Sequence, residues 1–349
     1  MRAHRYTTLA AGLAAASLVL AGCGEGSGGS ATGDSGGDGG GGGGGGGDQP
    51  TIAFVPKLQG IPYFEAMNTG GEQACAELGC EWLYQGPVEA DAAAQADIVR
   101  SYIQQGVDVL FVAPNDPDSM APLLQQAADA GIAVATTDTD APDSVREVFV
   151  SQASTEGIGQ TLTDELMTAM GGSGRYAIVS CGETAENLNS WIEVQREYTQ
   201  SEYPDAEITD VVYAGEDQTV ATQMATDLMN SDPSLTGLVG ECTSSAPGVA
   251  QAVRDAGKIG QVQTVGLGTP NSMAPYLEDG SAAASVLWDV EALGALTAWA
   301  GTQLAAGEEL SASPDVPGIE GVTYDEESNV LLLGDPLVLT ADNVGEYDY

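Results

Sequence analysis

The stretch from residue 109 to residue 137, VLFVAPNDPDSMAPLLQQAADAGIAVATT, contains one complete unit of the pattern that decides the fold. Val109–Ala113 is a short apolar run that predicts a strand, and Met120–Ala130 has the apolar spacing of an amphipathic helix. Gly131 follows that helix, at a position where a residue with positive φ commonly ends a helix. Ala133–Thr137 then predicts a second strand. A strand, a helix and a strand at this spacing indicate a parallel sheet covered by helices.

The same alternation continues on both sides of this unit and repeats in a second half. In the first half we expect strands and helices at Thr51–Pro56, Tyr63–Leu78, Glu81–Tyr84, Ala92–Gln105 and Val148–Ser151. In the second half we expect them at Gly157–Met170, Tyr176–Ser180, Trp191–Tyr203, Asp210–Tyr213, Thr219–Asn230, Gly237–Glu241, Pro247–Ala256, Val262–Gly266 and Ser272–Glu278. Two similar halves predict an α/β protein with two Rossmann-like lobes, parallel sheets and a ligand cleft between the lobes. Ligands of open α/β sheets bind beyond the carboxyl ends of the strands, and facing lobes bring two such ends together.

Each lobe is expected to combine separate segments of the 349-residue chain. We expect residues 51–152 and 289–327 to form the first lobe, and residues 153–288 and 328–349 to form the second. The part of the chain that follows residue 50 is long enough to favour two domains over one.

The N-terminus has the features of a secretion signal, which we assign to residues 1–22. Two arginines and a histidine precede the apolar run Leu9–Leu20, which is too short for a stable membrane span. The four residues that end in Cys23 resemble the lipobox of bacterial lipoproteins. This resemblance implies cleavage before Cys23 and a diacylglycerol on its thiol. An ordinary secretion signal with an incidental cysteine is the alternative.

Residues 23–50 consist mostly of Gly, Ser and Asp, with an unbroken glycine run from residue 39 to residue 47. Such a segment buries too little apolar surface to offset the entropy of ordering, so we expect a flexible tether. Several acyl chains on one cysteine anchor a protein firmly to a membrane. The folded part is therefore expected at the cell surface, on the extracytoplasmic face of the cell membrane.

The formal net charge of −42 excludes several classes of partner. A chain this acidic is repelled by nucleic acid, anionic lipid surfaces and polyanionic substrates. A hydrated carboxylate surface suits a salty or acidic exterior, so we ascribe the acidity to habitat and solubility. We expect a monomer that requires no cofactor and no metal.

His4 is the only histidine of the chain, and it leaves with the signal. No imidazole then remains for Ser-His-Asp or Cys-His catalysis, or for histidine-based zinc or iron sites. Catalysis by carboxylates needs no histidine, so an enzyme that uses aspartate or glutamate is the alternative.

Four cysteines follow Cys23, and an even number outside the cell favours disulfides. Cys75 lies near the end of a predicted helix and Cys80 opens the next strand, so a small local loop is available for a bridge. Cys181 and Cys242 each end a strand, and these two strands are neighbours in a doubly wound order. Both pairs are therefore candidate disulfides. The alternative is that the four cysteines bind a metal, although no histidine and no CxxC motif accompanies them.

Several separate motifs resemble the type I periplasmic-binding-protein family. They are IAFVPKLQGIPYFEAMNTGGEQACAELG from residue 52, WLYQGPVEADAAAQ from residue 82, VATTDTDAPDS from residue 134, VGLGTPNSMAPYLEDG from residue 265 and VLWDVEALG from residue 286. Within the family they are similar to the branch of rhamnose-binding and autoinducer-2-binding (Lsr-type) proteins, as is the closing NVLLLGDPLVLTADNVGEYDY. The resemblance covers nearly all of residues 51–349. It implies a solute receptor of an ABC importer, whose two lobes close on a sugar-like ligand.

The resemblance also implies ligand contacts at the ends of predicted strands. Lys57 matches a ligand-contacting lysine, Asp138 matches an aspartate that binds ligand hydroxyls, and Trp288 with Asp289 lies at the second crossing between the lobes. A carboxylate accepts two strong hydrogen bonds from adjacent hydroxyls. Turn capping and a calcium site are the alternatives for Asp138.

Seven further residues are candidates for ligand contact. Tyr63 or Phe64 offers an aromatic face for the C–H face of a sugar, with core packing as the alternative. The polar candidates at loop positions are Asn115, Asn187, Asn189, Glu241 and Thr243. The autoinducer-2 receptors carry Asp-Gln where this chain has Asn187 and Leu188, and Pro and Ala at the positions of Glu241 and Thr243. These departures weaken the autoinducer-2 assignment and leave the sugar assignment standing.

We therefore expect a lipid-anchored solute receptor that binds a monosaccharide, with rhamnose as first choice, and hands it to the permease subunits of an ABC transporter. A receptor for autoinducer-2 or another sugar-like signal is the alternative. A secreted glycosidase that uses a pair of carboxylates is a more remote alternative, since such an enzyme needs two carboxylates at a defined separation across the cleft.

Overall fold

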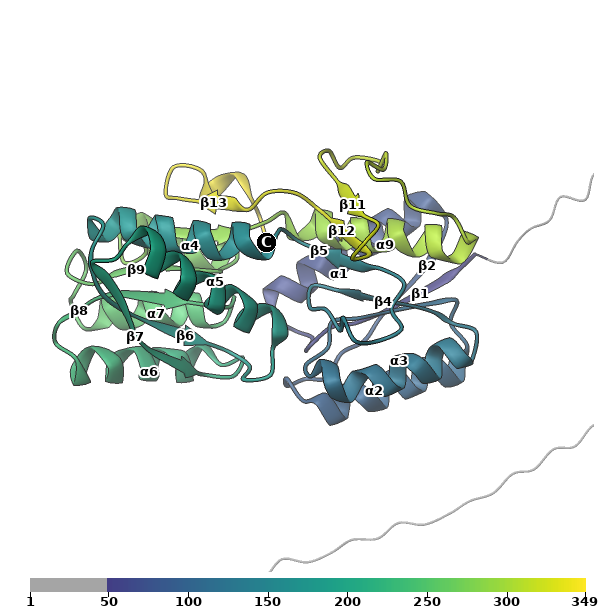
Figure 1. The fold of residues 1–349 in the computed structure, drawn as a ribbon, viewed down its shortest axis with the longest axis horizontal. Helices are drawn as coiled ribbons and strands as arrows, with labels where there is room; N and C mark the ends of the chain where they lie inside the picture. Colours follow the sequence, from purple (N-terminus) through teal and green to yellow (C-terminus); the bar gives the residue numbers. More distant parts are fainter. Residues whose placement is uncertain (1–48) are drawn as a thin grey trace, which may run out of the picture. The chain divides into compact units, whose positions relative to one another are not determined.

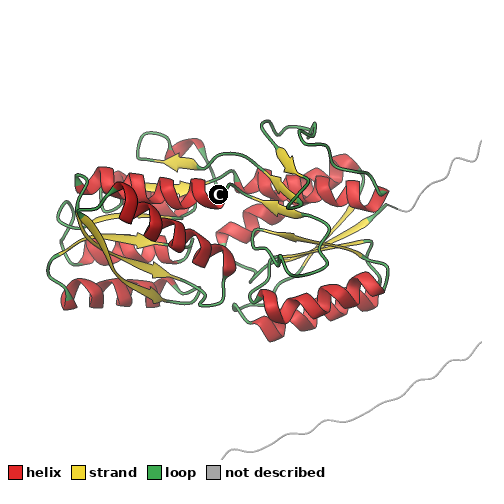
Figure 2. Cartoon of the chain, in the orientation of Figure 1, coloured by secondary structure: helices red, strands yellow, loops and turns green. Residues whose placement is uncertain are grey.

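The structure, a computed structural model, describes residues 49–349. The expected signal peptide, Cys23 and nearly all of the expected tether lie outside the described residues. The described part contains two sheets of mostly parallel strands, and helices cover both faces of each sheet (Figure 1, Figure 2). The predicted α/β class with two lobes is confirmed. No helix within residues 49–349 combines the length and apolar character needed to cross a membrane.

The first lobe is built on a seven-stranded sheet with the order β11-β12-β5-β4-β3-β1-β2. Its pairs are parallel except for the hairpin β11–β12. The strands are β1 (Thr51–Val55), β2 (Glu81–Tyr84), β3 (Val109–Val112), β4 (Ala133–Thr137), β5 (Phe149–Ser151), β11 (Thr323–Asp325) and β12 (Val330–Leu332). The helices are α1 (Pro62–Leu78), α2 (Ala92–Gln105), α3 (Pro117–Asp129) and α9 (Val290–Ala306).

Strand β1 shows why helices lie on both faces of this sheet. Ile52 and Phe54 belong to an apolar cluster that includes residues of α1 and α9. Ala53 and Val55, which point the other way, belong to a cluster with residues of α2 and α3. All four side chains are fully buried, and so the strand is a continuous apolar run, as is typical of covered parallel sheets.

The second lobe repeats this plan on a six-stranded sheet with the order β13-β10-β9-β8-β6-β7. Only β13 pairs antiparallel, with β10. The strands are β6 (Gly174–Ser180), β7 (Ala206–Tyr213), β8 (Leu235–Gly240), β9 (Gln263–Gly266), β10 (Ala284–Leu287) and β13 (Leu337–Leu339). The helices are α4 (Thr155–Met170), α5 (Glu186–Glu202), α6 (Gln218–Ser231), α7 (Ser245–Asp255), α8 (Pro270–Asp279) and the 3₁₀ helix η1 (Val344–Glu346).

The chain passes between the lobes after β5, after β10 and after β12. The third passage differs from the expected change of lobe after residue 327. Strand β12 pairs in parallel with β5 of the first sheet, and the chain joins the second sheet only at β13. Residue 327 lies inside the tight β11–β12 hairpin, whose three-residue strands are too short to give a recognisable apolar pattern.

Helices α1 and α9 lie side by side in close contact because each has a glycine where they meet (Figure 1). A Cβ atom at Gly70 would lie 1.9 Å from the carbonyl oxygen of Glu291, and one at Gly294 would lie 1.9 Å from that of Met67. Helix α9 begins directly after Trp288 and Asp289. This packing therefore fixes the path of the chain where it returns to the first lobe.

Two disulfides are present in the described part of the chain. Cys75 is joined to Cys80 across the end of α1, and Cys181 is joined to Cys242 with their Cα atoms 6.2 Å apart. Strands β6 and β8 are neighbours, as the doubly wound order predicts. The second disulfide therefore ties together the loops that follow these two strands.

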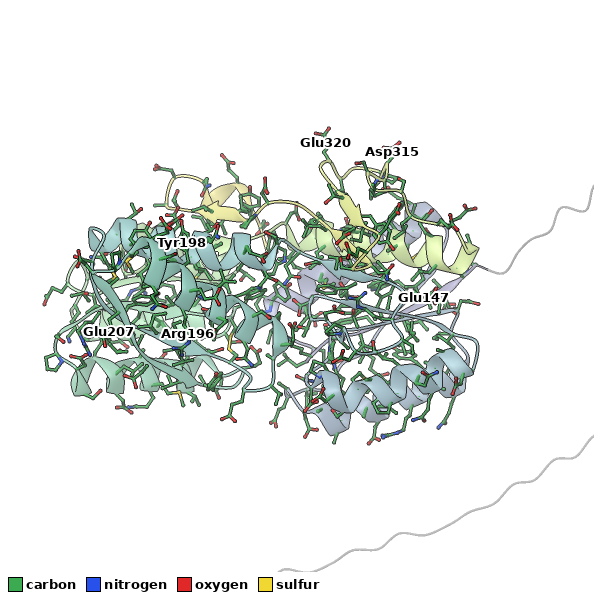
Figure 3. All side chains as sticks on the ribbon, in the orientation of Figure 1. Glu147, Arg196, Tyr198, Glu207, Asp315 and Glu320 are labelled. Carbon is green, nitrogen blue, oxygen red and sulfur yellow. A yellow bond between two sulfur atoms is a disulfide. The ribbon has the colours of Figure 1, made fainter. Side chains whose placement is uncertain are left out.

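Acidic side chains are spread over the outer surface of both lobes. Glu207 on β7, and Asp315 and Glu320 in the segment before β11, project outward and are exposed (Figure 3). Groups that stay hydrated in this way support the interpretation of the acidity as a means of solubility.

Candidate functional site

The carboxyl ends of strands from both sheets surround one cavity. Its free space is about 40 Å³, which is room for only about three water molecules. The first lobe lines it with residues after β1 and β4 and at the start of α1, and the second lobe with residues from α5 and from the loops after β7, β8 and β9. The lining residues are Lys57, Ile61, Tyr63, Phe64, Asp138, Asn187, Leu188, Trp191, Glu216, Glu241, Cys242, Thr243, Leu267 and Trp288.

Asp138 directly follows β4 and has a left-handed backbone with a φ of 64°. This conformation is uncommon for a residue other than glycine, although aspartate tolerates it better than most. The carboxylate accepts hydrogen bonds from the Tyr63 hydroxyl at 2.7 Å and from the Thr139 hydroxyl at 2.9 Å. A strained backbone held by several partners is typical of sites where a side chain must be fixed in advance.

Lys57 follows β1 and connects the two lobes. Its Nζ donates a hydrogen bond to Oδ1 of Asn187 at 2.9 Å and lies 3.6 Å from Oδ2 of Asp138. Lys57 and Asn187 are 5% and 7% exposed, so the bond is shielded from water. The backbone of Lys57 is held in turn by Asn115, whose Nδ2 donates to the Lys57 carbonyl oxygen.

Aromatic rings form one wall of the cavity. The Trp288 ring packs edge-to-face against Tyr63 and Trp191, with centroids 5.9 Å apart in both pairs. The Trp288 side chain is buried, and its indole N–H makes no well-formed hydrogen bond within residues 49–349, although it lies close enough to the Tyr63 hydroxyl to lower the pKa of that group. A buried donor without a well-formed hydrogen bond is costly unless another molecule satisfies it.

Burial raises the pKa of Tyr63 well above its ordinary value, and the charge of Asp138 raises it further. The phenol therefore stays protonated and keeps donating to the carboxylate. This pair presents a fixed acceptor next to an aromatic face, an arrangement that suits hydroxyl groups on an otherwise apolar ring.

The second lobe contributes two carboxyl groups to the cavity. Glu241 is fully buried after β8, and Nε2 of Gln195 donates to both of its oxygens at 2.8 Å. Burial raises the pKa of Glu241 to about 8, against the smaller lowering effect of the Gln195 hydrogen bond. Glu241 therefore holds its proton for much of the time at neutral pH.

Glu216 lies in the loop between β7 and α6 and accepts a hydrogen bond from the Ser244 hydroxyl at 3.1 Å. Burial raises the pKa of Glu216, the charge of Lys57 lowers it, and the charge of Asp138 raises it. Two of these influences come from the opposite lobe. Glu216 therefore faces the Lys57–Asp138 pair across the cavity.

The structure brings most of the sequence-derived candidates to this one cavity. Those that line it are Lys57, Tyr63, Phe64, Asp138, Asn187, Glu241, Thr243 and Trp288. Three candidates lie elsewhere. Asn115 supports Lys57 from behind, as described above, and Asn189 donates to the Glu183 carbonyl oxygen at the edge of the lobes. Asp289 is exposed and caps α9 by accepting from the Ala292 amide, the usual role of an aspartate that precedes a helix.

Six lining residues were not among the candidates for ligand contact. They are Ile61, Leu188, Trp191, Glu216, Cys242 and Leu267. Trp191 belongs to α5 and is 3% exposed, and its buried face meets the cavity. Glu216 comes three residues after the end of β7, so its position in the loop after a strand was the signal that could have identified it.

Residues 52–309 match the protein family described as "Periplasmic binding protein domain". A curated relative, the D-ribose/D-allose-binding protein of Pseudomonas aeruginosa, is 27% identical over 248 residues, which cover 67% of this chain and 75% of the relative. The ribose import binding protein of Bacillus subtilis is 20% identical over 260 residues, which cover 73% of this chain and 82% of that protein.

Two solved structures are similar over 86% of this chain. One is an ABC transporter solute binding protein from Clostridium phytofermentas with bound L-rhamnose, at 30% identity, a TM-score of 0.81 and 98% coverage of its own chain. The other is LsrB from Clostridium saccharobutylicum in complex with AI-2, at 27% identity, a TM-score of 0.81 and 100% coverage of its own chain. With two lobes, a cavity at the strand ends and a family match over most of its length, this chain belongs to the periplasmic binding protein family and has the type I fold.

Proposed function

We propose that this chain is the extracytoplasmic solute-binding component of an ABC importer, and that its cavity binds a monosaccharide, with L-rhamnose or a similar deoxy-sugar as first choice. The observation that supports this most directly is Asp138, held in a left-handed conformation by Tyr63 and Lys57 in a cavity that the Trp288 ring also lines. A carboxylate and an indole donor are the partners that neighbouring sugar hydroxyls need, and the aromatic rings suit the C–H face of the sugar.

The preference for a deoxy-sugar rests on the aliphatic part of the lining. Ile61, Leu188 and Leu267 line the same cavity as the charged groups. A methyl group in place of a hydroxymethyl group would be favoured against such side chains, because no hydroxyl would be left without a partner. The similar solved structure with bound L-rhamnose supports the same choice.

Autoinducer-2 is the alternative, and the similar LsrB structure in complex with AI-2 favours it. The four residues at which this chain departs from the autoinducer-2 receptors, Asn187, Leu188, Glu241 and Thr243, all line the cavity. Substitutions at the lining change what a site accepts far more than substitutions elsewhere. We therefore rank autoinducer-2 below a sugar.

Binding would work by closure of the two lobes on the ligand. We expect a sugar bound at Asp138 to displace the hydrogen bond between Lys57 and Asn187, because both residues line the cavity and Lys57 Nζ lies 3.6 Å from that carboxylate. Residues of both lobes then bind the ligand, and the binding free energy shifts an open–closed equilibrium towards the closed form. The permease subunits of the importer recognise that form. No bond of the ligand is broken.

The lipid anchor at Cys23 is part of the proposal and rests on the lipobox sequence. Cells fed a fatty-acid analogue should label the wild-type protein. The Cys23→Ser variant should stay unlabelled and appear in the medium. Release of the wild type into the medium without label would contradict the anchor.

The binding proposal is tested by thermal shift and calorimetry on residues 49–349 with L-rhamnose, D-ribose, D-allose, D-glucose and autoinducer-2. A ligand at 100 times its Kd raises the free energy of unfolding by about 2.7 kcal/mol. We expect L-rhamnose to give the largest shift. If no sugar binds and autoinducer-2 does, the alternative replaces the proposal. Aryl glycosides incubated with the protein should remain intact.

A further inference from the structure

A second chamber of about 220 Å³ adjoins the central cavity. Ile61, Glu216 and Thr243 line both spaces, so the two spaces share a wall. The chamber is bounded on one side by the start of α1 in the first lobe and on the other by the starts of α6, α7 and α8 in the second.

The other large space between the lobes does not continue the cavity. It has a volume of about 460 Å³ and an acidic rim that includes Asp116, Asp143 and Glu186. None of the residues that line it also lines the central cavity. Of these two spaces, only the 220 Å³ chamber shares lining residues with the central cavity, so it is the one towards which a longer ligand would extend.

The walls of the chamber combine polar groups with a few apolar surfaces. Thr243 offers a hydroxyl group, and Gln218, the first residue of α6, offers an exposed amide. The apolar part is supplied by Ile61, Pro62 and Pro247. The chamber is therefore lined by the same two kinds of group as the central cavity, hydrogen-bonding groups and apolar side chains.

Three helices also begin at this chamber, and their N-terminal N–H groups lack side-chain caps. The N-cap residues of α1, α7 and α8 are Ile61, Ser244 and Thr269, and none of them makes a capping hydrogen bond with its side chain. Ser244 donates its hydroxyl hydrogen to Glu216, and Thr269 donates its own to Ser272. In α7 the N–H groups of Ser245 and Ala246 donate to Cys242, and in α8 the N–H of Asn271 donates to the carbonyl oxygen of Tyr349. The start of α1 is therefore the main source of backbone donors for other oxygen atoms.

We propose that the chamber is an outer subsite for a neutral, hydroxylated substituent of the bound sugar, such as a second sugar unit linked to the ring in the central cavity. This inference rests on the proposed function and deepens it. Glu216 on the shared wall disfavours an anionic substituent, and the Thr243 hydroxyl and the Gln218 amide suit hydroxyl groups. The central cavity and the chamber together come close to the roughly 300 Å³ at which pockets for small molecules begin.

The test compares a monosaccharide with its disaccharide by calorimetry, using L-rhamnose with rhamnobiose and D-glucose with maltose. For at least one pair, the wild type should bind the disaccharide about tenfold more tightly than the monosaccharide. Ser272→Trp fills the chamber without touching the central cavity, since Ser272 lines only the chamber. This variant should lose the tenfold difference and keep its affinity for the monosaccharide within about threefold.

Two further variants keep the test decisive. Gln218→Trp places the same bulk on an exposed helix start and replaces Ser272→Trp if that variant fails to fold. Ser201→Trp, on an exposed turn of α5, is the matched control and should keep the disaccharide preference. If the wild type binds a monosaccharide but prefers it over the disaccharide, the subsite is wrong and the proposed function stands. If it binds neither sugar of either pair nor any sugar of the panel, both are wrong.

Discussion

Lys57 of the first lobe and Asn187 of the second lobe are joined by a hydrogen bond of 2.9 Å inside the cavity in which we propose that the sugar binds. Both side chains are almost completely buried. The two lobes thus hold each other through the groups that a ligand would use. Ligand entry must exchange this bond for new ones, so its strength sets part of the affinity.

Replacement of Asn187 by Ala should open the lobes in the absence of sugar. The hydrogen bond from a charged donor is worth about 1.5–3 kcal/mol, so its loss should raise the open population by about tenfold or more. Small-angle X-ray scattering should show a larger radius of gyration for the variant. Asn189→Ala, two residues further along α5 and outside the cavity, is the control and should leave the scattering curve unchanged. Identical curves for wild type and Asn187→Ala would show that this bond does not hold the lobes.

Asp138→Asn should weaken sugar binding by about tenfold to a hundredfold, because a neutral amide replaces the charged acceptor of two ligand hydroxyls. Asparagine is the better probe than alanine, since it tolerates the left-handed backbone at this position. Calorimetry with the sugar that stabilises the wild type most measures the loss. The control is Asp143→Asn, an exposed aspartate on the same loop. Undiminished affinity in Asp138→Asn would remove this residue from the proposed site.

Glu241 should make the folded state less stable as the pH rises. Its pKa is raised from 4.5 to about 8 in the folded protein, so the folded state binds the proton more tightly than the unfolded state. The stabilisation from this proton is complete below about pH 4.5 and is lost as the pH rises to about 8. Glu241→Gln keeps the shape and one acceptor oxygen for Gln195, without the charge.

We therefore expect the melting temperature of Glu241→Gln, relative to the wild type, to rise between pH 5 and pH 8 and to level off above that range. The exposed Glu183→Gln variant should show a much smaller trend. A constant difference across this range would mean that Glu241 has an ordinary pKa in the folded protein.

Gly294→Ala should destabilise the first lobe by about 1–3 kcal/mol, the usual cost of overpacking, because the added methyl would meet backbone atoms of α1. Chemical denaturation measures the change. Gly334→Ala is the control, since a Cβ atom there meets nothing within 4 Å. Equal stabilities for the two variants would show that α1 and α9 can move apart without loss.

The alternation of strands and helices could be predicted because each central strand is a continuous apolar run next to a helix with one apolar face. Helix α9 and strand β10 gave no such signal. Helix α9 is buried around most of its circumference, so it lacks the polar face that makes a helix recognisable. The strands β11 to β13 have three residues each, which is less than two full periods of alternation.

The candidate site was predictable wherever a polar residue comes within two positions of the end of a strand, as Lys57, Asp138 and Glu241 do. Glu216 occupies an equivalent place but is one of 51 acidic residues, and this background hides a single functional carboxylate. Asp289 is the opposite case, since it does not line the cavity and caps α9. Its place before a helix suits a cap as well as a ligand contact, and only the structure distinguishes the two.

The three passages of the chain between the lobes have a practical consequence. Because the lobes are connected by three covalent segments, any relative movement must be a bending of those segments rather than a separation. The distance between two dyes, one attached to α2 and one to α6, would then change in a single reproducible way with occupancy. A protein whose lobes are connected in this way is suited to conversion into a fluorescent sensor that reports the solute concentration outside the cell.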